Sequence, residues 1–354
     1  MKLFLINLVK LVDEWRISLM KITIKDVARL SGVSITTVSQ ILNHKGERFS
    51  AETKKKVLDV VAEYDYKADY FAQNMISKRT KTIGMVVPDV TDLFFSKVIE
   101  GVENYLNELG FMILLCNSNH SSEKENIYID ELLHRSVEGI ILASPNPIHV
   151  PKLIDDRGRK KIPYILIDRG LNERDEGKLI TNEFQGAYEA VELLINQGHT
   201  KIGMLGNETS FYEITDRFLG YQKCLMNHGI DYQERFVTNE PLTIKGGYEG
   251  AQKILKQDVT ALFCGNDQMA VGAYRAINEV GKKIPEDISV IGYDGLELTD
   301  YMVPALTTVR QPIFEIGYFA AKFLVDNINN PKEKIPNKYF DTKLMKKNST
   351  KKLD

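Results

Sequence analysis

The chain has 354 residues, and 43% of them are hydrophobic, so it can bury a substantial core and form two or three lobes. Its three cysteines are far apart and odd in number, which argues against a disulfide framework and for a reducing, cytoplasmic compartment. No stretch approaches the ~18–20 apolar residues that cross a membrane, so no membrane partner is expected.

The net charge of −2 conceals an uneven distribution along the chain. Residues 20–81 contain 12 Lys and Arg against 7 Asp and Glu, a balance of +5, whereas residues 82–354 contain 31 against 39, a balance of −8. Residues 1–19 add +1, which gives the net −2. A basic segment joined to an acidic body is typical of a DNA-binding module with a second domain, although a charged run alone is more often a solvated surface.

We do not expect the first 19 residues to form a signal peptide, because charged residues interrupt their apolar run and no small-residue cleavage site follows. The segment that begins at Met20 looks like the start of a complete protein. We therefore expect residues 1–19 to be a non-native N-terminal extension.

Residues 23–43 have the pattern of two short helices joined by a tight turn. Thr23 and Asp26 can form a capping box at the first helix, Gly32 supplies the turn, and Ser34 can cap the second helix. The second helix carries short polar side chains opposite its apolar face, and such a face fits the major groove of DNA. The candidate DNA contacts are Thr23, Ser34, Ile35, Thr36, Thr37, Ser39, Gln40 and Asn43.

An ordinary pair of bundle helices would give a similar pattern, and the next segment decides between the two. Ser50 can cap a third helix with a basic first half, and the residues after Asp65 have too little apolar surface to form a core alone. We therefore predict a helix-turn-helix DNA-binding domain over residues 20–68 and a linker over residues 69–81.

From Thr82 onward, short apolar runs alternate with helical patterns in two similar series. Such alternation predicts an α/β fold with two lobes of doubly wound parallel sheet, in which ligands bind beyond the carboxyl ends of the strands. The expected strands lie near 83–87, 111–116, 140–143, 164–167, 201–205, 261–264 and 288–293. The expected helices lie near 94–109, 123–135, 183–197, 215–228, 245–257 and 267–280.

Polar side chains gather after these strands. Carboxylates can accept hydrogen bonds from neighbouring hydroxyls, while arginine and asparagine donate, so the set suits a polyhydroxylated ligand. The alternative is that these residues are helix caps and surface charges. Phe94 and Phe95, after the first strand, could stack on the apolar face of a sugar ring. The polar candidates are Asp168, Arg169, Arg217, Asn266, Asp267, Asp294 and Gln311.

Enzyme signatures are missing from the sequence. It has no GxxxxGK loop, no GxGxxG after the first strand, no GxSxG elbow and no HExxH, and its six histidines lack metal-ligand spacing. We therefore expect no catalytic activity, no metal and no cofactor. His199, just before a strand, is expected to be structural.

Between Met20 and about Lys347, a series of segments resembles, in the same order along the chain, the lactose/galactose repressor family of bacterial transcription factors. GNDQMAVGAY and IGYDGLELTDYMVPALTT look most like ribose operon repressors, and a sucrose or other sugar repressor is the nearest alternative. The matching segments are IKDVARLSGVSITTVSQILN, FAQNM, DLFFSKVIEGVE, ILIDR, NQGHTKIGMLGN, DRFLGY, CGNDQMAVGAYRAI and IPEDISVIGYDGLELTDYMVPALTTVRQP.

For the DNA-binding part, the resemblance implies that Ile35, Thr36 and Gln40 read bases. It also implies that residues 70–78 form a hinge helix that folds on operator DNA. Ala72 matches the small residue where paired hinge helices approach each other. Met75 stands where the family usually has a leucine that wedges into the minor groove, and methionine is apolar and flexible enough to take that role.

For residues 82–347, the resemblance implies a two-lobe, periplasmic-binding-protein-like domain for effector binding and dimerisation, and we expect a disordered tail over residues 348–354. Asp92 stands where ribose-binding relatives carry Asn, and Leu242 where they carry an aromatic residue, which leaves the identity of the sugar open. The implied effector contacts are Asp168, Arg217, Asn266, Asp294 and Gln311, with Asp92, Phe94, Phe95, Ser144 and Arg169 as further candidates.

The implied function is a homodimeric repressor of a sugar-utilisation operon, released from operator DNA when ribose or a related sugar or sugar phosphate binds between the lobes. A sugar-binding transport component would share the lobes, but it would need an export signal and would have no use for residues 20–81. A sugar-metabolising enzyme would need a catalytic base or a phosphate-binding motif, and none is evident.

Overall fold

The computed structural model describes residues 22–42, 47–67, 79–143, 162–167, 176–206 and 215–353. The expected extension over residues 1–19 and the expected hinge helix over residues 70–78 lie outside these ranges. The chain divides into two compact units, Met1–Thr80 and Lys81–Asp354. In the described part of the chain, none of the helices has the length and apolar character needed to span a bilayer.

The first unit contains three short helices, α2 (Ile24–Ser31), α3 (Ile35–Leu42) and α4 (Ala51–Glu63). Hydroxyls of Ser34 and Ser50 cap α3 and α4 by accepting hydrogen bonds from the backbone N–H of Thr37 and Thr53, at 3.1 and 3.2 Å. Gly32 provides the turn with a φ of +68°. The helices enclose a small apolar core of Val27, Ala28, Val38, Ile41 and Val57. The predicted helix-turn-helix is therefore confirmed.

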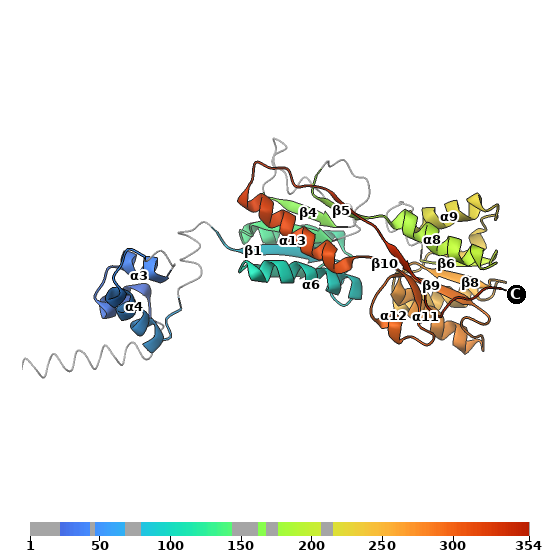
Figure 1. Cartoon of the computed structure of the whole chain (residues 1–354), viewed down its shortest axis with the longest axis horizontal. Coiled ribbons are helices and arrows are strands. Elements are labelled where there is room, and N and C mark those ends of the chain that lie inside the picture. Colours follow the sequence, from blue (N-terminus) through green and yellow to red (C-terminus); the bar gives the residue numbers. More distant parts are fainter. Residues whose placement is uncertain are drawn as a thin grey trace, which may run out of the picture. The chain divides into compact units, whose positions relative to one another are not determined.

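The second unit has two lobes (Figure 1). Lobe 1 is a six-stranded parallel sheet in the order β11-β5-β4-β3-β1-β2, covered by helices α6, α7 and α13. Its elements are β1 (Thr82–Val87), α6 (Leu93–Glu108), β2 (Met112–Asn117), α7 (Ser122–His134), β3 (Gly139–Ala143), β4 (Tyr164–Ile167), β5 (Lys178–Thr181), α13 (Ile313–Asn329) and β11 (Lys338–Phe340).

Strand β1 shows why helices cover both faces of this sheet. Ile83, Met85 and Val87 pack against α6 and α13, whereas Val86, on the opposite face, belongs to the apolar cluster that contains α7. Helices α6 and α13 approach closely, because a side chain at Gly101 or Gly317 would overlap the backbone of the other helix.

Lobe 2 has the sheet order β12-β10-β9-β8-β6-β7, parallel except for β12. Helices α8 and α9 cover one face and α10 and α11 the other. The elements are α8 (Glu183–Asn196), β6 (Ile202–Leu205), α9 (Asp216–Asn227), η2 (Glu234–Phe236), β7 (Val237–Thr238), α10 (Ile244–Ile254), β8 (Ala261–Cys264), α11 (Asp267–Glu279), β9 (Ser289–Asp294), α12 (Leu298–Tyr301), β10 (Thr307–Arg310) and β12 (Lys343–Met345). The expected doubly wound lobes are confirmed.

The two lobes are not consecutive in the chain. The chain passes from lobe 1 to lobe 2 after β5, returns after β10 to form α13 and β11, and crosses again to β12. Figure 1 shows α13, coloured as a late segment, lying beside the early helix α6.

The prediction of a disordered tail over residues 348–354 is wrong for its described part. The backbone oxygen of Ser349 accepts a hydrogen bond from Val290 N–H at 2.8 Å, and Leu353 N–H donates to Gln197 at 2.8 Å. Ser349 is fully buried. The polar composition suggested disorder, but the backbone of the tail forms hydrogen bonds with lobe 2.

His199 has the structural role that was expected. It is 1% exposed, and its ring nitrogens lie 2.9 Å from Thr260 Oγ1 and 3.1 Å from Ser289 Oγ. Burial lowers the pKa of His199, so the imidazole stays neutral inside lobe 2.

Candidate functional site

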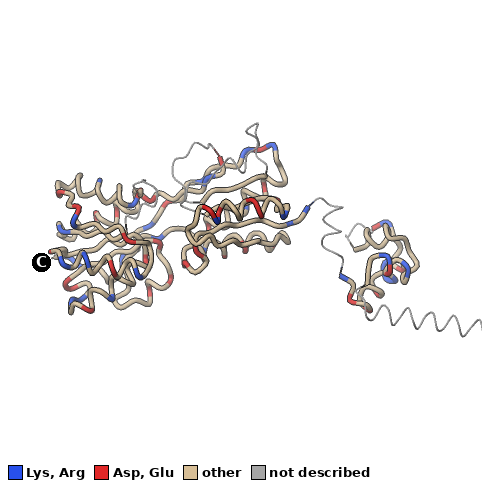
Figure 2. The backbone as a smooth tube through the Cα atoms, turned by 180° about the vertical axis from the view of Figure 1, so that it is seen from behind, with Lys and Arg blue, Asp and Glu red and all other residues tan. Residues whose placement is uncertain are grey.

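The predicted DNA-reading face lies on α3. Ile35 is 44% exposed, Thr36 is also exposed, and Thr37, Ser39 and Gln40 are half-buried. Figure 2 marks Lys and Arg on this unit, and the sequence places three lysines consecutively in α4. A partly exposed polar face, on a unit that also carries these basic residues, has the chemistry of a DNA-binding surface.

Three of the predicted DNA contacts also serve to cap helices. The backbone N–H and the hydroxyl of Thr23 donate to Asp26 Oδ2 at 3.0 and 2.6 Å. The hydroxyls of Ser34 and Thr37 lie 2.9 Å apart at the start of α3. These side chains therefore stabilise the motif whatever they contribute to DNA binding. Asn43, Ala72 and Met75 lie outside the described residues.

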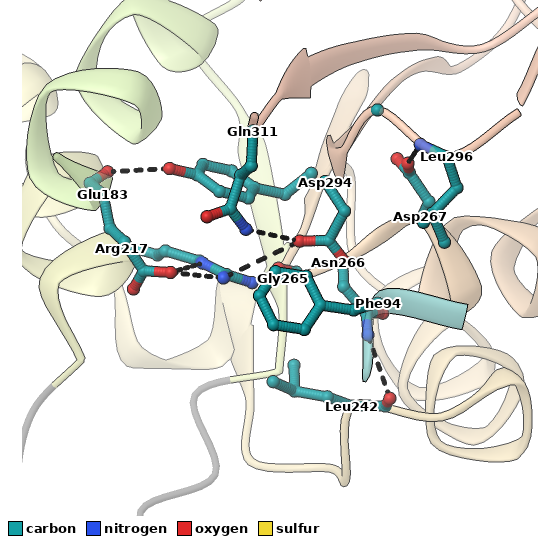
Figure 3. A network of polar contacts seen from close by, with 12 residues as sticks. Phe94, Glu183, Arg217, Leu242, Gly265, Asn266, Asp267, Asp294, Leu296 and Gln311 are labelled. Atoms are coloured by element: carbon teal, nitrogen blue, oxygen red, sulfur yellow. Dashed lines mark hydrogen bonds and ion pairs between the residues drawn. The ribbon is translucent and has the colours of Figure 1, made fainter. Parts of the chain in front are cut away.

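In the second unit, the predicted polar residues of lobe 2 come together at one edge of its sheet (Figure 3). Asp294 ends β9, Gln311 follows β10, Asn266 follows β8, and Arg217 lies in the first turn of α9. The carboxyl ends of neighbouring parallel strands lie at the same edge of a sheet, which is why residues so distant in the sequence meet here.

Arg217 is held in place on several sides. Its Nε donates to Glu183 Oε1 at 3.0 Å, its Nη2 donates to the same oxygen, and its Nη1 donates to the backbone oxygen of Gly265 at 2.6 Å. The guanidinium carbon lies 4.1 Å from the centre of the Tyr293 ring. These contacts fix the plane of the guanidinium, whose Nη2 lies 3.8 Å from Asp294 Oδ1.

Asp294 is the buried carboxylate of the cluster, 3% exposed, with an unusual backbone φ of +110°. Gln311 Nε2 donates to its Oδ1 at 2.8 Å. Burial raises the pKa of Asp294 well above its ordinary value, and the charge of Asp267 raises it further, while Arg217 lowers it. The contacts with Gln311 and Arg217 both use Oδ1 of this carboxylate, so Oδ2 can accept from a ligand.

Gln311 carries a polar atom that lacks a partner. The residue is 3% exposed, and its Oε1 accepts no hydrogen bond from any described residue. A buried carbonyl oxygen without a donor is costly, and a ligand hydroxyl would satisfy it.

Asn266 and Asp267 organise the loops around the site. Asn266 caps α11 by accepting from Met269 N–H at 2.8 Å, and its Nδ2 donates to the backbone oxygen of Leu242 at 3.0 Å. Asp267 is fully buried and accepts from Thr308 Oγ1 at 2.6 Å and from Leu296 N–H at 2.8 Å. Asp267 therefore stabilises the loop after Asp294.

Lobe 1 contributes the start of α6. Asp92 caps this helix by accepting from Phe94 N–H at 2.7 Å, and burial raises the pKa of Asp92. The charge of Asp92 also raises the pKa of Asp294. Phe94 is only 7% exposed and contacts Phe95 edge to face at 5.2 Å between ring centres. Figure 3 shows Phe94 with the lobe 2 cluster.

Two residues of the cluster were missed by the sequence analysis, Glu183 and Tyr293 (the latter in the interior of β9). Glu183 directly follows the crossing from lobe 1 to lobe 2 after β5, a strand that the sequence analysis did not predict, so the signal that identified Asp294 was absent there. Ser144, Asp168 and Arg169 lie outside the described residues. Within the described ranges, no group of three or more His, Cys, Asp and Glu is arranged to hold a metal ion.

Comparison with known proteins identifies both units. Residues 23–69 match the model for bacterial regulatory proteins of the lacI family, and residues 191–350 match the periplasmic binding protein-like domain. The HTH-type transcriptional repressor PurR of Vibrio campbellii is 36% identical over 94% of this chain and 99% of that protein. The ribose operon repressor of Haemophilus influenzae is 33% identical over 88% of this chain and 93% of that protein.

Solved structures agree with this assignment. The lac repressor dimer bound to operator and the anti-inducer ONPF is 26% identical, with a TM-score of 0.84 over 94% of this chain and all of that one. A LacI family transcriptional regulator from Enterococcus faecium with bound ribose is 33% identical, with a TM-score of 0.71 over 77% of this chain and all of that one. The chain therefore belongs to the lacI family of bacterial regulatory proteins, and it is a DNA-binding transcriptional repressor, not an enzyme.

Proposed function

We propose that this protein is a cytoplasmic, homodimeric repressor of a sugar-utilisation operon, and that an uncharged sugar bound between its lobes releases it from operator DNA. Ribose is the first candidate for the effector. The observation that carries the proposal is the buried cluster of Arg217, Asp294 and Gln311, in which Gln311 Oε1 lacks a hydrogen-bond donor.

A sugar hydroxyl matches this cluster because it both donates and accepts. Gln311 Oε1 and Asp294 Oδ2 would accept from hydroxyls, and Arg217 would donate to one. Asn266 and Phe94 would line the same site, with the ring of Phe94 against the carbon atoms of the sugar. Asp92, Phe95, Ser144, Asp168 and Arg169 are the remaining proposed contacts.

The charges of the site favour an uncharged sugar over its phosphate ester. The site contains the buried carboxyl group of Asp294, the charge of Asp92 acts on it, and the charge of Arg217 is already matched by Glu183. A phosphate would add negative charge beside these carboxylates, in surroundings where repulsion is screened only weakly.

The names of the relatives do not agree on one effector. The relative named PurR is slightly more identical to this chain than the ribose operon repressor. The ribose-bound regulator from Enterococcus faecium supports ribose at 33% identity. Asp92 and Leu242, where the family resemblance implies Asn and an aromatic residue in ribose-binding relatives, are the positions where we propose that another sugar would be selected.

On the DNA side, we propose that Ile35, Thr36 and Gln40 contact base edges, with Thr23, Ser34, Thr37, Ser39 and Asn43 beside them. Ala72 and Met75 are proposed for the hinge helix. The operator-bound lac repressor is a dimer, and this supports two copies of α3 on one pseudo-palindromic operator.

The test is a gel shift with the full-length protein and the DNA upstream of its own gene. We expect a shifted band that ribose abolishes and ribose 5-phosphate leaves in place. Asp294→Ala and Arg217→Ala should retain the shift but lose the response to ribose. A protein that ignores this DNA even at low salt, or a response to no member of a sugar panel, would contradict the proposal.

A further inference from the structure

One hydrogen bond joins the proposed reading face of α3 to the turn before α4. Arg48 Nη2 donates to Gln40 Oε1 at 2.5 Å, although the two residues are eight positions apart. Arg48 is itself held, since its guanidinium carbon lies 5.0 Å from the centre of the Phe49 ring. Phe49 packs against the apolar core of the three helices. A chain of contacts therefore runs from the core, through Phe49 and Arg48, to Gln40.

This bond has a chemical consequence for base readout. The amide of a glutamine can rotate by half a turn, so it can present either its oxygen or its NH₂ group to a base. An arginine that donates to Oε1 keeps the amide oxygen of the glutamine turned towards the guanidinium. In the rotated amide, Nε2 would face the guanidinium, and two donors cannot form a hydrogen bond. The other end of Gln40, the donor Nε2, is then the one offered to DNA.

We propose that Arg48 is a specificity-determining residue that orients Gln40, so that the two residues read one base pair as a unit. Together they present N–H donors, from Gln40 Nε2 and from the remaining nitrogens of Arg48. In the major groove these donors match the N7 and O6 acceptors of guanine, and they exclude the N4 amino group of cytosine. The pair is thus expected to prefer guanine at its position.

Two simpler roles for Arg48 lead to different expectations. An exposed arginine that contacts only phosphate would strengthen binding to every sequence alike, with a dependence on salt. An exposed arginine that only stabilises the fold would change the melting temperature, but exposed hydrogen bonds of this kind contribute little to stability. Base preference separates the proposed role from both. The inference depends on DNA binding and is independent of the effector.

The experiment is selection of duplexes from a randomised pool by the full-length protein, followed by affinity measurements on the winning duplex. The variants are Arg48→Ala, Arg48→Lys, Gln40→Ala and the double variant Arg48→Ala/Gln40→Ala. Lys56→Ala is the matched control, because it removes one positive charge from α4, where Lys56 pairs with Glu52 at 2.8 Å.

We expect Arg48→Ala and Gln40→Ala to relax the preference at the same base pair and to weaken binding of the selected duplex by about 10-fold each. The double variant should be little weaker than either single variant, because the two residues act together. Arg48→Lys should keep the general affinity but not the base preference, since lysine lacks the planar fork. Lys56→Ala should leave the preference intact.

The proposal is overturned if Arg48→Ala weakens all duplexes equally and Arg48→Lys restores the affinity, because Arg48 would then be a phosphate contact. It is also overturned if Arg48→Ala leaves the selected sequence unchanged, or if its only effect is a lower melting temperature.

Discussion

Glu183 and Arg217 form a nearly buried ion pair in which one carboxylate oxygen accepts from both Nε and Nη2 of the guanidinium. Their side chains are 16% and 11% exposed. The two residues lie in the first turns of α8 and α9, which pack closely because Gly220 fits against the backbone of Phe184. Helix packing therefore sets the orientation of Arg217 before any ligand arrives.

Glu183→Gln should weaken ribose binding by about 10-fold, because it removes a charged acceptor worth ~1.5–3 kcal/mol from Arg217. Affinity for operator DNA without sugar should not change. Titration calorimetry and a gel shift measure the two quantities. Glu189→Gln is the matched control on α8, since Glu189 accepts only from Gln185 Nε2 in the described contacts. An unchanged affinity for ribose would show that Glu183 does not position Arg217.

Gln311→Met should separate stability from binding. Methionine has a similar volume and removes the buried Oε1 that has no donor, but it also removes the bond from Nε2 to Asp294. We expect the free energy of unfolding to change by less than about 1 kcal/mol, because the two effects oppose each other. Ribose affinity should fall by at least about 10-fold. Urea denaturation and calorimetry check this, and intact binding would remove Gln311 from the site.

Asp267 should make stability depend on pH. Burial raises the pKa of Asp267 from 3.8 to about 7. Between these values the folded protein binds a proton that the unfolded chain releases, so the contribution of this group to stability is largest at low pH and declines as the pH rises towards 7. The substitution Asp267→Asn keeps the shape of the side chain and one of its two acceptor oxygens, but it removes the negative charge.

The variant should therefore gain stability relative to the wild type as the pH rises from 5 to 8. Urea denaturation at several pH values provides the measurement. Exposed Asp231, replaced by Asn, serves as the control. A constant difference between Asp267→Asn and the wild type over this range would contradict the raised pKa.

Ser349→Ala tests the order of the C-terminal tail. The hydroxyl of Ser349 donates to the backbone oxygen of Val290 at 2.6 Å and accepts from Thr307 N–H at 2.8 Å. Its loss leaves two buried backbone groups unpaired, so we expect a destabilisation of about 2 kcal/mol in urea denaturation. Exposed Lys352, replaced by Ala, should have no effect. A disordered tail would predict no loss for either variant.

The sequence alone determined the features that depend on neighbouring residues. The caps at Ser34 and Ser50, the turn at Gly32 and the alternation of strands and helices are local patterns, because side-chain burial repeats with the period of each element. The meeting of Asn266, Asp294 and Gln311 also followed from sequence, since the carboxyl ends of parallel strands always share one edge.

Only the tertiary structure decided which distant segments meet. Three contacts illustrate this: the return of α13 to lobe 1, the pairing of Glu183 with Arg217, and the bond from Arg48 to Gln40. In each case, no repeating sequence pattern indicates that the residues are in contact. The tail around Ser349 shows the same limit most clearly. Its polar side chains predict disorder. Its order comes instead from hydrogen bonds of backbone N–H and C=O groups, which nearly every residue carries. Only the tertiary structure shows which groups of lobe 2 are close enough to form these bonds.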